Sequence, residues 1–256
     1  MPMLTEIAAG VLVATNDWAM TTTTVVARPD GGCLLIDPAV TPADLSALAG
    51  ELDRRGLRPR AGWATHPHWD HVLWSRELGD VPRFAAPAAA ARVTAERDRM
   101  FTQTAHDAPG HDPGLFGRLT ALEPGAGVIP WDGPAAQVII HDAHAPGHGA
   151  VFLPGTGTLI AGDMCSDVEM PLLDLDGNDP IGDYRAGLAR LAALTGVRQV
   201  VPGHGQVGDA AEFRRRIAAD QTYLDALERG QPFGDSRLTQ DWLRAEHDTQ
   251  LRFASR

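Results

Sequence analysis

The sequence predicts an α/β fold in which two β-sheets pack face to face and helices cover the outside. The first observation is that short apolar runs outnumber helical segments early in the chain, while strands and helices alternate in both halves. The second is that His and Asp residues recur directly after apolar runs. A sheet would bring such residues to a common edge, where loops held by a rigid framework carry chemistry.

Length and composition limit the classes of protein. The chain has 256 residues, of which 44% are hydrophobic and 21% charged, which is typical of a globular protein. We expect one domain over residues 1–256 that includes a C-terminal helical region at about 206–256. The net charge of -11 argues against a nucleic-acid partner, and the absence of Lys excludes a Lys Schiff base.

The cellular compartment is predicted from the small number of cysteines and from the lack of a visible secretion signal. Two cysteines, Cys33 and Cys165, do not form a disulfide framework. No secretion signal and no membrane-spanning stretch is visible. We therefore expect a soluble cytoplasmic protein without a membrane partner.

The N-terminal half begins with strands and continues with alternating elements. Thr41 is the predicted N-cap of a helix with Pro42 at its first position. A long irregular segment at residues 102–117 is typical of a lid or binding loop, and we expect His106 and His111 to be exposed there. The predicted strands are residues 10–15, 22–28, 33–36, 61–65 and 84–86, and further helices are expected at 70–78 and 87–100.

The C-terminal half is predicted to repeat this alternation and to end in a polar tail. Tyr184 is expected to pack in the core, and Arg214, Arg215 and Arg216 are expected on a solvated helix face. The predicted strands are residues 138–141, 150–153, 158–161 and 199–201, and the helices are 179–194 and 208–229.

The densest group of potential ligands follows the strand predicted at residues 61–65. It reads His66-Pro67-His68-Trp69-Asp70-His71, and three further groups follow later strands or turns: His148, Asp163 and His204. Imidazoles and carboxylates suit zinc and similar divalent ions. One zinc ion takes three or four protein ligands, so seven groups predict a site for two ions with one shared carboxylate.

These motifs resemble those of the metallo-β-lactamase-fold hydrolases, in particular the glyoxalase II-like and lactonase-like branches. The resemblance implies a four-layer αβ/βα sandwich over roughly residues 10–205 and two divalent ions, zinc first, with iron or manganese as alternatives. It also implies the ligands: His66, His68 and His148 for the first ion, Asp70, His71 and His204 for the second, and Asp163 as the bridge.

Residues near the motif are given supporting roles. Asp163 occupies the place of the Cys ligand found in some zinc β-lactamases, and Cys165 is two residues away. Cys165 is expected to pack near the site, because a free Cys is usually a small buried hydrophobic side chain. His141 and His144 are expected to be structural or to support the ligands, and Asp37 to serve a turn or a ligand.

A two-metal site predicts hydrolysis of a small molecule. Two divalent ions lower the pKa of water held between them, and the resulting hydroxide can attack an ester, thioester, lactone or amide carbonyl. Asp70 would orient this nucleophile and pass its proton to the leaving group. Alternatives are a persulfide dioxygenase-like oxidoreductase, a β-lactam hydrolase, a nuclease and a metal-binding protein without turnover. The charge and the complete second ligand set disfavour the nuclease and the single-iron oxidoreductase.

Overall fold

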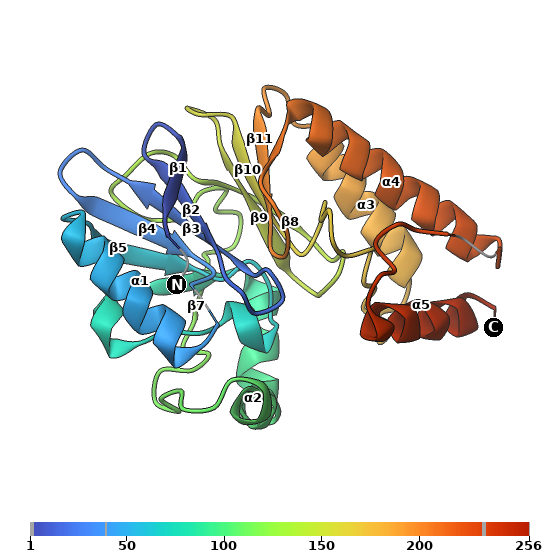
Figure 1. Cartoon of the computed structure of the whole chain (residues 1–256), viewed down its shortest axis with the longest axis horizontal. Helices are drawn as coiled ribbons and strands as arrows, with labels where there is room; N and C mark the ends of the chain where they lie inside the picture. Colours follow the sequence, from blue (N-terminus) through green and yellow to red (C-terminus); the bar gives the residue numbers. More distant parts are fainter. Residues whose placement is uncertain (1–2, 39, 232–233, 256) are drawn as a thin grey trace.

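Two β-sheets packed face to face form the centre of the protein (Figure 1). The computed structural model describes residues 3–38, 40–231 and 234–255. The first sheet has the order β1-β2-β3-β4-β5-β6-β7 and the second the order β12-β11-β10-β9-β8. The strands of the first sheet are β1 (Thr5–Ala8), β2 (Val11–Thr15), β3 (Thr22–Ala27), β4 (Gly32–Ile36), β5 (Arg58–Trp63), β6 (Arg83–Ala85) and β7 (Thr120–Ala121). Those of the second sheet are β8 (Gln137–His141), β9 (His148–Leu153), β10 (Thr158–Gly162), β11 (Gln199–Pro202) and β12 (Gly208–Asp209).

The directions of the strands bring several loops to one edge of this pair of sheets. β4 and β5 pair in parallel in the first sheet, and β10 and β11 do so in the second. The carboxyl ends of parallel neighbours lie at the same edge of a sheet. The loops after β4, β5, β10 and β11 therefore meet where the two sheets face each other.

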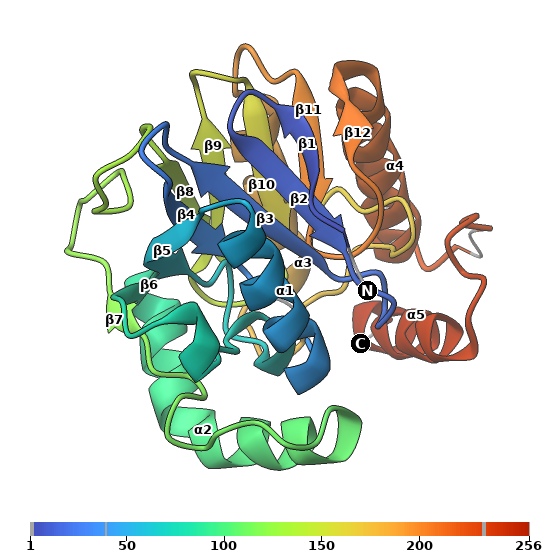
Figure 2. The same ribbon diagram turned by 60° about the vertical axis from the view of Figure 1, so that its left-hand side comes forward.

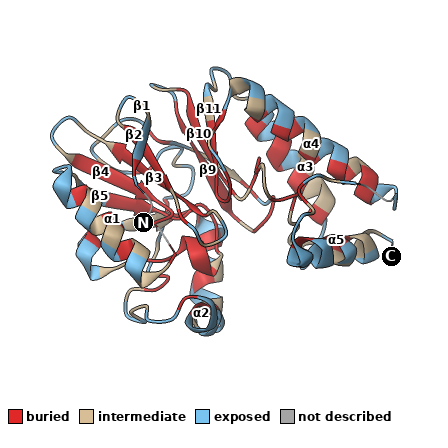
Figure 3. Ribbon diagram, viewed as in Figure 1, coloured by how far each residue is buried: buried red, intermediate tan, exposed pale blue. Residues whose placement is uncertain are grey.

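Helices cover the outer faces, so the fold is a four-layer sandwich as expected. α1 (Pro42–Arg54) and α2 (Pro87–Asp107) pack on the first sheet, and α3 (Pro180–Ala192) and α4 (Ala210–Glu228) on the second (Figure 2). α5 (Asp241–Ala254) packs beside α4. Buried residues concentrate between the sheets and under the helices (Figure 3). Thr41 caps α1 as predicted, because its hydroxyl accepts from the Asp44 amide at 3.1 Å.

Two expectations about helices are wrong. Residues 70–78 form two short 3₁₀ turns, η1 (Trp69–His71) and η2 (Arg76–Leu78), because residues 69–74 are all buried and leave no solvent-facing side for a helix. The helix predicted at 87–100 continues to Asp107, so the irregular segment begins later. The expected C-terminal helical region includes α5, whose buried stripe of Leu243, His247 and Gln250 is largely polar. Among the described residues, no helix is both long enough and apolar enough to cross a bilayer.

Trp63 joins the two sheets at the end of β5. Its side chain is 1% exposed, and Nε1 donates to the Gly149 carbonyl of β9 at 2.9 Å. We predict that Trp63→Ala lowers the free energy of unfolding by about 3–5 kcal/mol, because it leaves a cavity between the sheets. Urea unfolding of the metal-free protein measures this. Trp242→Ala, at a side chain that is 43% exposed, serves as the control and should change stability by less than about 1 kcal/mol. Equal effects of the two substitutions would contradict the prediction.

Candidate metal centre

Five strand ends deliver the polar side chains of the site. Asp37 follows β4, and the His66–His71 segment follows β5. Asp163 and His204 follow β10 and β11, the two parallel strands of the second sheet. His144 lies in the connection from β8 to β9. The sequence therefore places these groups at one edge through strand direction rather than through closeness in the chain.

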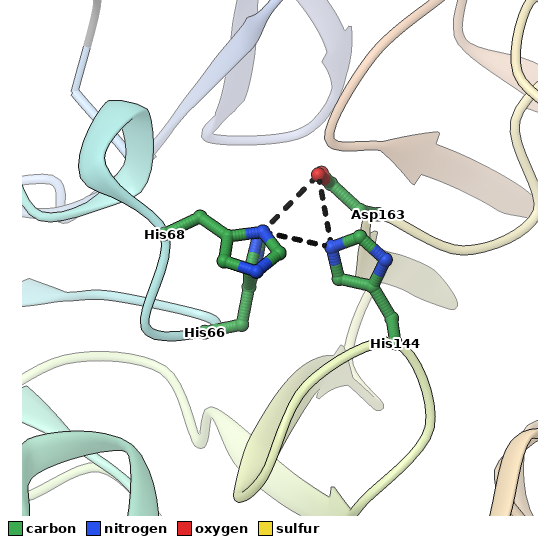
Figure 4. Close-up of side chains that lie close together, drawn as sticks. All are labelled: His66, His68, His144 and Asp163. Atoms are coloured by element: carbon green, nitrogen blue, oxygen red, sulfur yellow. Dashed lines mark hydrogen bonds and ion pairs between the residues drawn. The ribbon is translucent and has the colours of Figure 1, made fainter. Parts of the chain in front are cut away.

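A first group contains His66, His68, His144 and Asp163 (Figure 4). His68 Nδ1 lies 3.1 Å from His66 Nε2 and 3.0 Å from His144 Nε2. Asp163 Oδ2 lies 3.4 Å from both of these Nε2 atoms. His68 and Asp163 thus each contact the Nε2 atoms of His66 and His144, and the His68 ring stands across from His144 in the figure.

A second group contains Asp70, His71 and His204, and Asp163 lies beside it. Asp70 Oδ2 is 3.4 Å from His71 Nε2 and 3.3 Å from His204 Nε2. Asp163 is equally close, with Oδ1 3.3 Å from His71 Nε2 and Oδ2 3.5 Å from His204 Nε2. The two groups therefore share the Asp163 carboxylate.

These spacings fit divalent metal ions. Zinc binds nitrogen and oxygen at about 2.0–2.2 Å in tetrahedral sites, so its ligands stand about 3.4 Å apart. Asp163 Oδ1 is buried and has no hydrogen-bond partner among the described residues, although a buried carboxylate oxygen normally has one. The donor types, their distances and this unpaired oxygen together fit a pair of such ions.

The far nitrogens of three imidazoles are held by hydrogen bonds. His144 Nδ1 faces the Leu172 carbonyl at 3.0 Å, and His204 Nδ1 faces the Ala19 carbonyl at 2.9 Å. His71 Nδ1 faces Asp37 Oδ2 at 2.9 Å. Because carbonyl and carboxylate oxygens only accept, the hydrogen-bond network assigns the proton to Nδ1 and leaves a lone pair on Nε2. That tautomer is the one that a metal site requires.

Asp37 orients ligands on both sides of the site. Its Oδ1 accepts from the Thr65 amide at 2.8 Å, and Oδ2 accepts from the Thr65 hydroxyl at 2.6 Å. The Thr65 hydroxyl oxygen in turn lies 3.0 Å from His66 Nδ1. Together with its bond to His71, these contacts make Asp37 the support of one ligand from each group, the second of the two roles expected for it.

Burial and neighbouring charge set the protonation of the site. Burial, with help from the nearby His71, lowers the pKa of His66 to about 4, so this imidazole is neutral at pH 7. Burial acts in the same direction on His71 and His204, but the nearby carboxylates, with Asp163 the strongest, together outweigh it and raise the pKa of both. Without a metal ion, protons on these two imidazoles balance the carboxylates, so metal ions and protons compete for the same atoms.

His148 does not lie where the resemblance implied. It is the first residue of β9, it pairs with His141 across the hairpin, and the two rings stack with centroids 4.6 Å apart. A Cβ at Gly162 would stand 2.3 Å from His148 Nε2, so this nitrogen abuts backbone rather than the two groups. The structure groups His144, expected to be a supporting residue, with the first donors in place of His148.

The strand ends of the structure separate the two histidines. His144 stands three residues after the end of β8, as His66 does after the end of β5, whereas His148 opens β9. The sequence alone did not give this spacing, because the strand predicted at residues 61–65 ends directly before His66. The similar Pro-Gly-His turns at 146–148 and 202–204 favoured His148 instead.

Three further expectations have clear outcomes. Cys165 and Tyr184 are buried in the core, as predicted. Arg216 is also buried, and its guanidinium donates to the carbonyls of Cys165 at 3.2 Å and Gln206 at 2.9 Å, so the expectation of a solvated face is wrong for this residue. Arg216 holds together the loops that carry Asp163 and His204.

Glu169 is a member of the site that no sequence pattern indicated. Its side chain is buried, and its Oε1 lies 3.9 Å from His204 Nδ1. It forms a third cluster with Asp163 and His204. His106 and His111, the histidines of the predicted lid, stand apart from all three clusters: His106 is exposed, and His111 bonds the Val40 carbonyl at 2.8 Å.

A cavity of about 1200 Å³ opens over the two groups. Its walls come from the loop after β2, from α2, from the segment after β10 and from the region of α5. His68, Asp70, His144, Asp163 and His204 face it. A small molecule can therefore reach the donor atoms from this side.

The comparisons with known proteins define the class. The sequence profile of the metallo-beta-lactamase superfamily matches residues 16–221. The chain belongs to this superfamily, whose members bind divalent metal ions. Within it, the chain is 30% identical over 203 residues to hydroxyacylglutathione hydrolase of Rhodobacter capsulatus, a match that covers 74% of this chain and 70% of the relative.

Solved structures agree on the fold. A beta-lactamase domain protein from Burkholderia ambifaria superposes with a TM-score of 0.69 at 19% identity, over 98% of this chain and 86% of the other. A metallo-beta-lactamase family protein from Thermus thermophilus gives 0.64 at 21% identity, over 91% and 84%. At these identities the similarity concerns the fold alone.

Removing the Asp37 charge should weaken metal binding. Asp37 has a positive φ of 48°, which Asn tolerates, so Asp37→Asn keeps the backbone while placing an amide against the His71 Nδ1 proton. We predict about 10- to 100-fold weaker zinc affinity, measured by competition with a chromophoric chelator. The control is Asp30→Asn, at an exposed turn. Unchanged zinc affinity in Asp37→Asn would contradict the role given to this carboxylate.

The two candidate histidines can be separated by metal content. We predict that His144→Ala retains about one zinc ion per chain, whereas His148→Ala retains two, because only His144 faces the other donors. Mass spectrometry of the dialysed proteins measures this, with circular dichroism as the check on folding. The reverse result, with His148→Ala losing the ion, would restore the assignment by resemblance.

Proposed function

We propose that the chain is a hydrolase with two zinc ions that cleaves an ester, thioester, lactone or amide bond of a small molecule. The observation that supports it most is the pair of donor groups sharing Asp163 at the edge of an open cavity. In this proposal His66, His68 and His144 hold one ion, Asp70, His71 and His204 hold the other, and Asp163 contacts both.

The residues around the cavity have distinct tasks in such a reaction. Two divalent ions bound here would supply an activated water nucleophile and an electrophile for the carbonyl oxygen. Burial alone would raise the pKa of Asp70, but the charges and hydrogen bonds of His71 and His204 together outweigh it, lower this pKa and keep the carboxyl ionised. The carboxylate can orient the attacking water, accept its proton and return that proton to the leaving group. The buried imidazoles exclude solvent and fix the donor atoms.

Hydrolysis is favoured over the oxidoreductase alternative by the second group. A single iron would use the first group only, whereas Asp70, His71 and His204 form a complete second set. The name of the Rhodobacter capsulatus relative describes hydrolysis of a hydroxyacyl-glutathione. Oxygen consumption with glutathione persulfide separates the two activities, and we expect none.

Asp70→Asn tests the role of the carboxylate in turnover. We predict a loss of kcat of about 100- to 10,000-fold on the best substrate in a panel of activated esters, thioesters, lactones and β-lactams. Cys165→Ala, a change at a buried side chain two residues from Asp163, should stay within about threefold of wild type and serves as the control. Full activity in Asp70→Asn, or a zinc-loaded wild type that cleaves nothing in the panel, would contradict the proposal.

A further inference from the structure

The cavity over the metal centre has strongly acidic walls. Of the described residues, eight carboxylates line it but only two guanidinium groups. The carboxylates are Asp17, Asp70, Asp107, Asp163, Asp167, Glu169, Asp174 and Glu246, and the guanidinium groups are Arg99 and Arg237. Even two divalent ions, which would offset four of these charges, leave the negative charges in excess.

Both arginines are already engaged by carboxylates. The Arg237 side chain is 5% exposed, and its guanidinium contacts Asp220 Oδ1 at 2.5 Å and Asp235 Oδ2 at 2.7 Å. Arg99 Nε donates to Glu96 Oε2 at 3.0 Å on the surface of α2. The sequence contains no Lys. Among the residues that the structure describes, the cavity wall therefore offers no uncommitted Arg or Lys to an anionic group.

Several of the acidic groups, in contrast, lack a cationic partner. Asp17 and Glu246 are exposed on separate walls of the cavity, and neither forms an ion pair with a described residue. Glu169 stands deeper, and the His204 imidazole is its basic partner. An anionic substrate would therefore meet uncompensated negative charge at the cavity entrance.

The remaining lining is apolar and partly aromatic. Trp18 packs edge to face on Trp69 with ring centroids 5.0 Å apart, beside the second donor group. Leu172 and Leu173 line the cavity from the segment after β10, and Trp242 contributes a half-exposed ring from α5. Such surface stabilises an apolar acyl chain or leaving group by removing it from water.

We infer that this cavity selects substrates that carry an apolar arm and no net negative charge, and disfavours anionic thioesters such as those of free glutathione. The inference rests on the proposed function in one respect: it takes the cavity as the substrate site. Like charges at close range cost binding free energy, and charge complementarity is the usual source of such selectivity.

A pair of thioethers tests the inference through binding. S-hexylglutathione carries a net negative charge, and its diethyl ester carries a net positive charge because both carboxylates are masked. Neither contains a thioester bond, and chromatography after each measurement checks that the ester bonds of the diester are intact. We expect the diester to bind the zinc-loaded protein about tenfold more tightly or better, measured by tryptophan fluorescence and calorimetry. Equal or tighter binding of the anion, or no binding of the diester at millimolar concentration, overturns the inference.

Two double substitutions test whether charges on the cavity wall cause the preference for the diester. Asp17→Asn/Glu246→Gln removes two charges from the wall, and Asp53→Asn/Glu77→Gln removes two from exposed sites outside it. We expect the affinity ratio to fall by about threefold or more in the first protein and to stay unchanged in the second. The same ratio in both proteins contradicts the inference. Failure to cleave any compound of the panel would refute the proposed function alone, whereas efficient hydrolysis with a preference for anionic thioesters would refute the inference alone.

Discussion

The rest of the site depends on one constraint: imidazole nitrogens in the protein interior point their lone pairs at one another. His68 Nδ1 faces the Nε2 atoms of both His66 and His144 at about 3 Å, and one proton on His68 cannot serve both contacts. Without a cation this arrangement is repulsive and costly in a buried setting. With a divalent ion between them, the same lone pairs become ligands. Metal binding should therefore stabilise the fold as well as enable chemistry.

The backbone around the site adopts uncommon conformations that place the ligand atoms close together. Five of the described non-glycine residues have positive φ, and each lies at the site or beside it: Ala19, Met20, Asp37, His144 and Cys165. Such conformations cost of order 1–3 kcal/mol each and persist only where surrounding contacts enforce them. Gly203 serves the same end, since a Cβ there would stand 1.9 Å from Asp163 Oδ1. The strained backbone conformations at these positions place the ligands, and the packing of the two sheets maintains them.

Much of the fold could be predicted from the sequence, because apolar runs show where strands end. Seven ligands were predicted, and the structure brings six of them together. Apolar runs followed by His or Asp identified the edge where β5, β10 and β11 deliver their side chains. His148 misled because two imidazoles flank one Pro-Gly turn, and only the register of the β8–β9 hairpin decides which one faces the site. Arg216 was misjudged because its buried guanidinium finds a partner far away in the chain, which no local pattern records.

The acidic cavity links these local features to selection of a substrate. The superfamily fold supplies the metal centre, whereas α2, the segment after β10 and the region of α5 supply the wall around it. Because these elements lie outside the two sheets, their charge can change without disturbing the ligands. Chemistry and selectivity thus reside on different parts of the chain.

Anomalous diffraction at the zinc edge from crystals of the zinc-loaded protein tests the central claim most directly. The account predicts two peaks about 3.5–4 Å apart with Asp163 between them and His144 against the first. A single peak, or a peak coordinated by His148 while His144 points elsewhere, would contradict it.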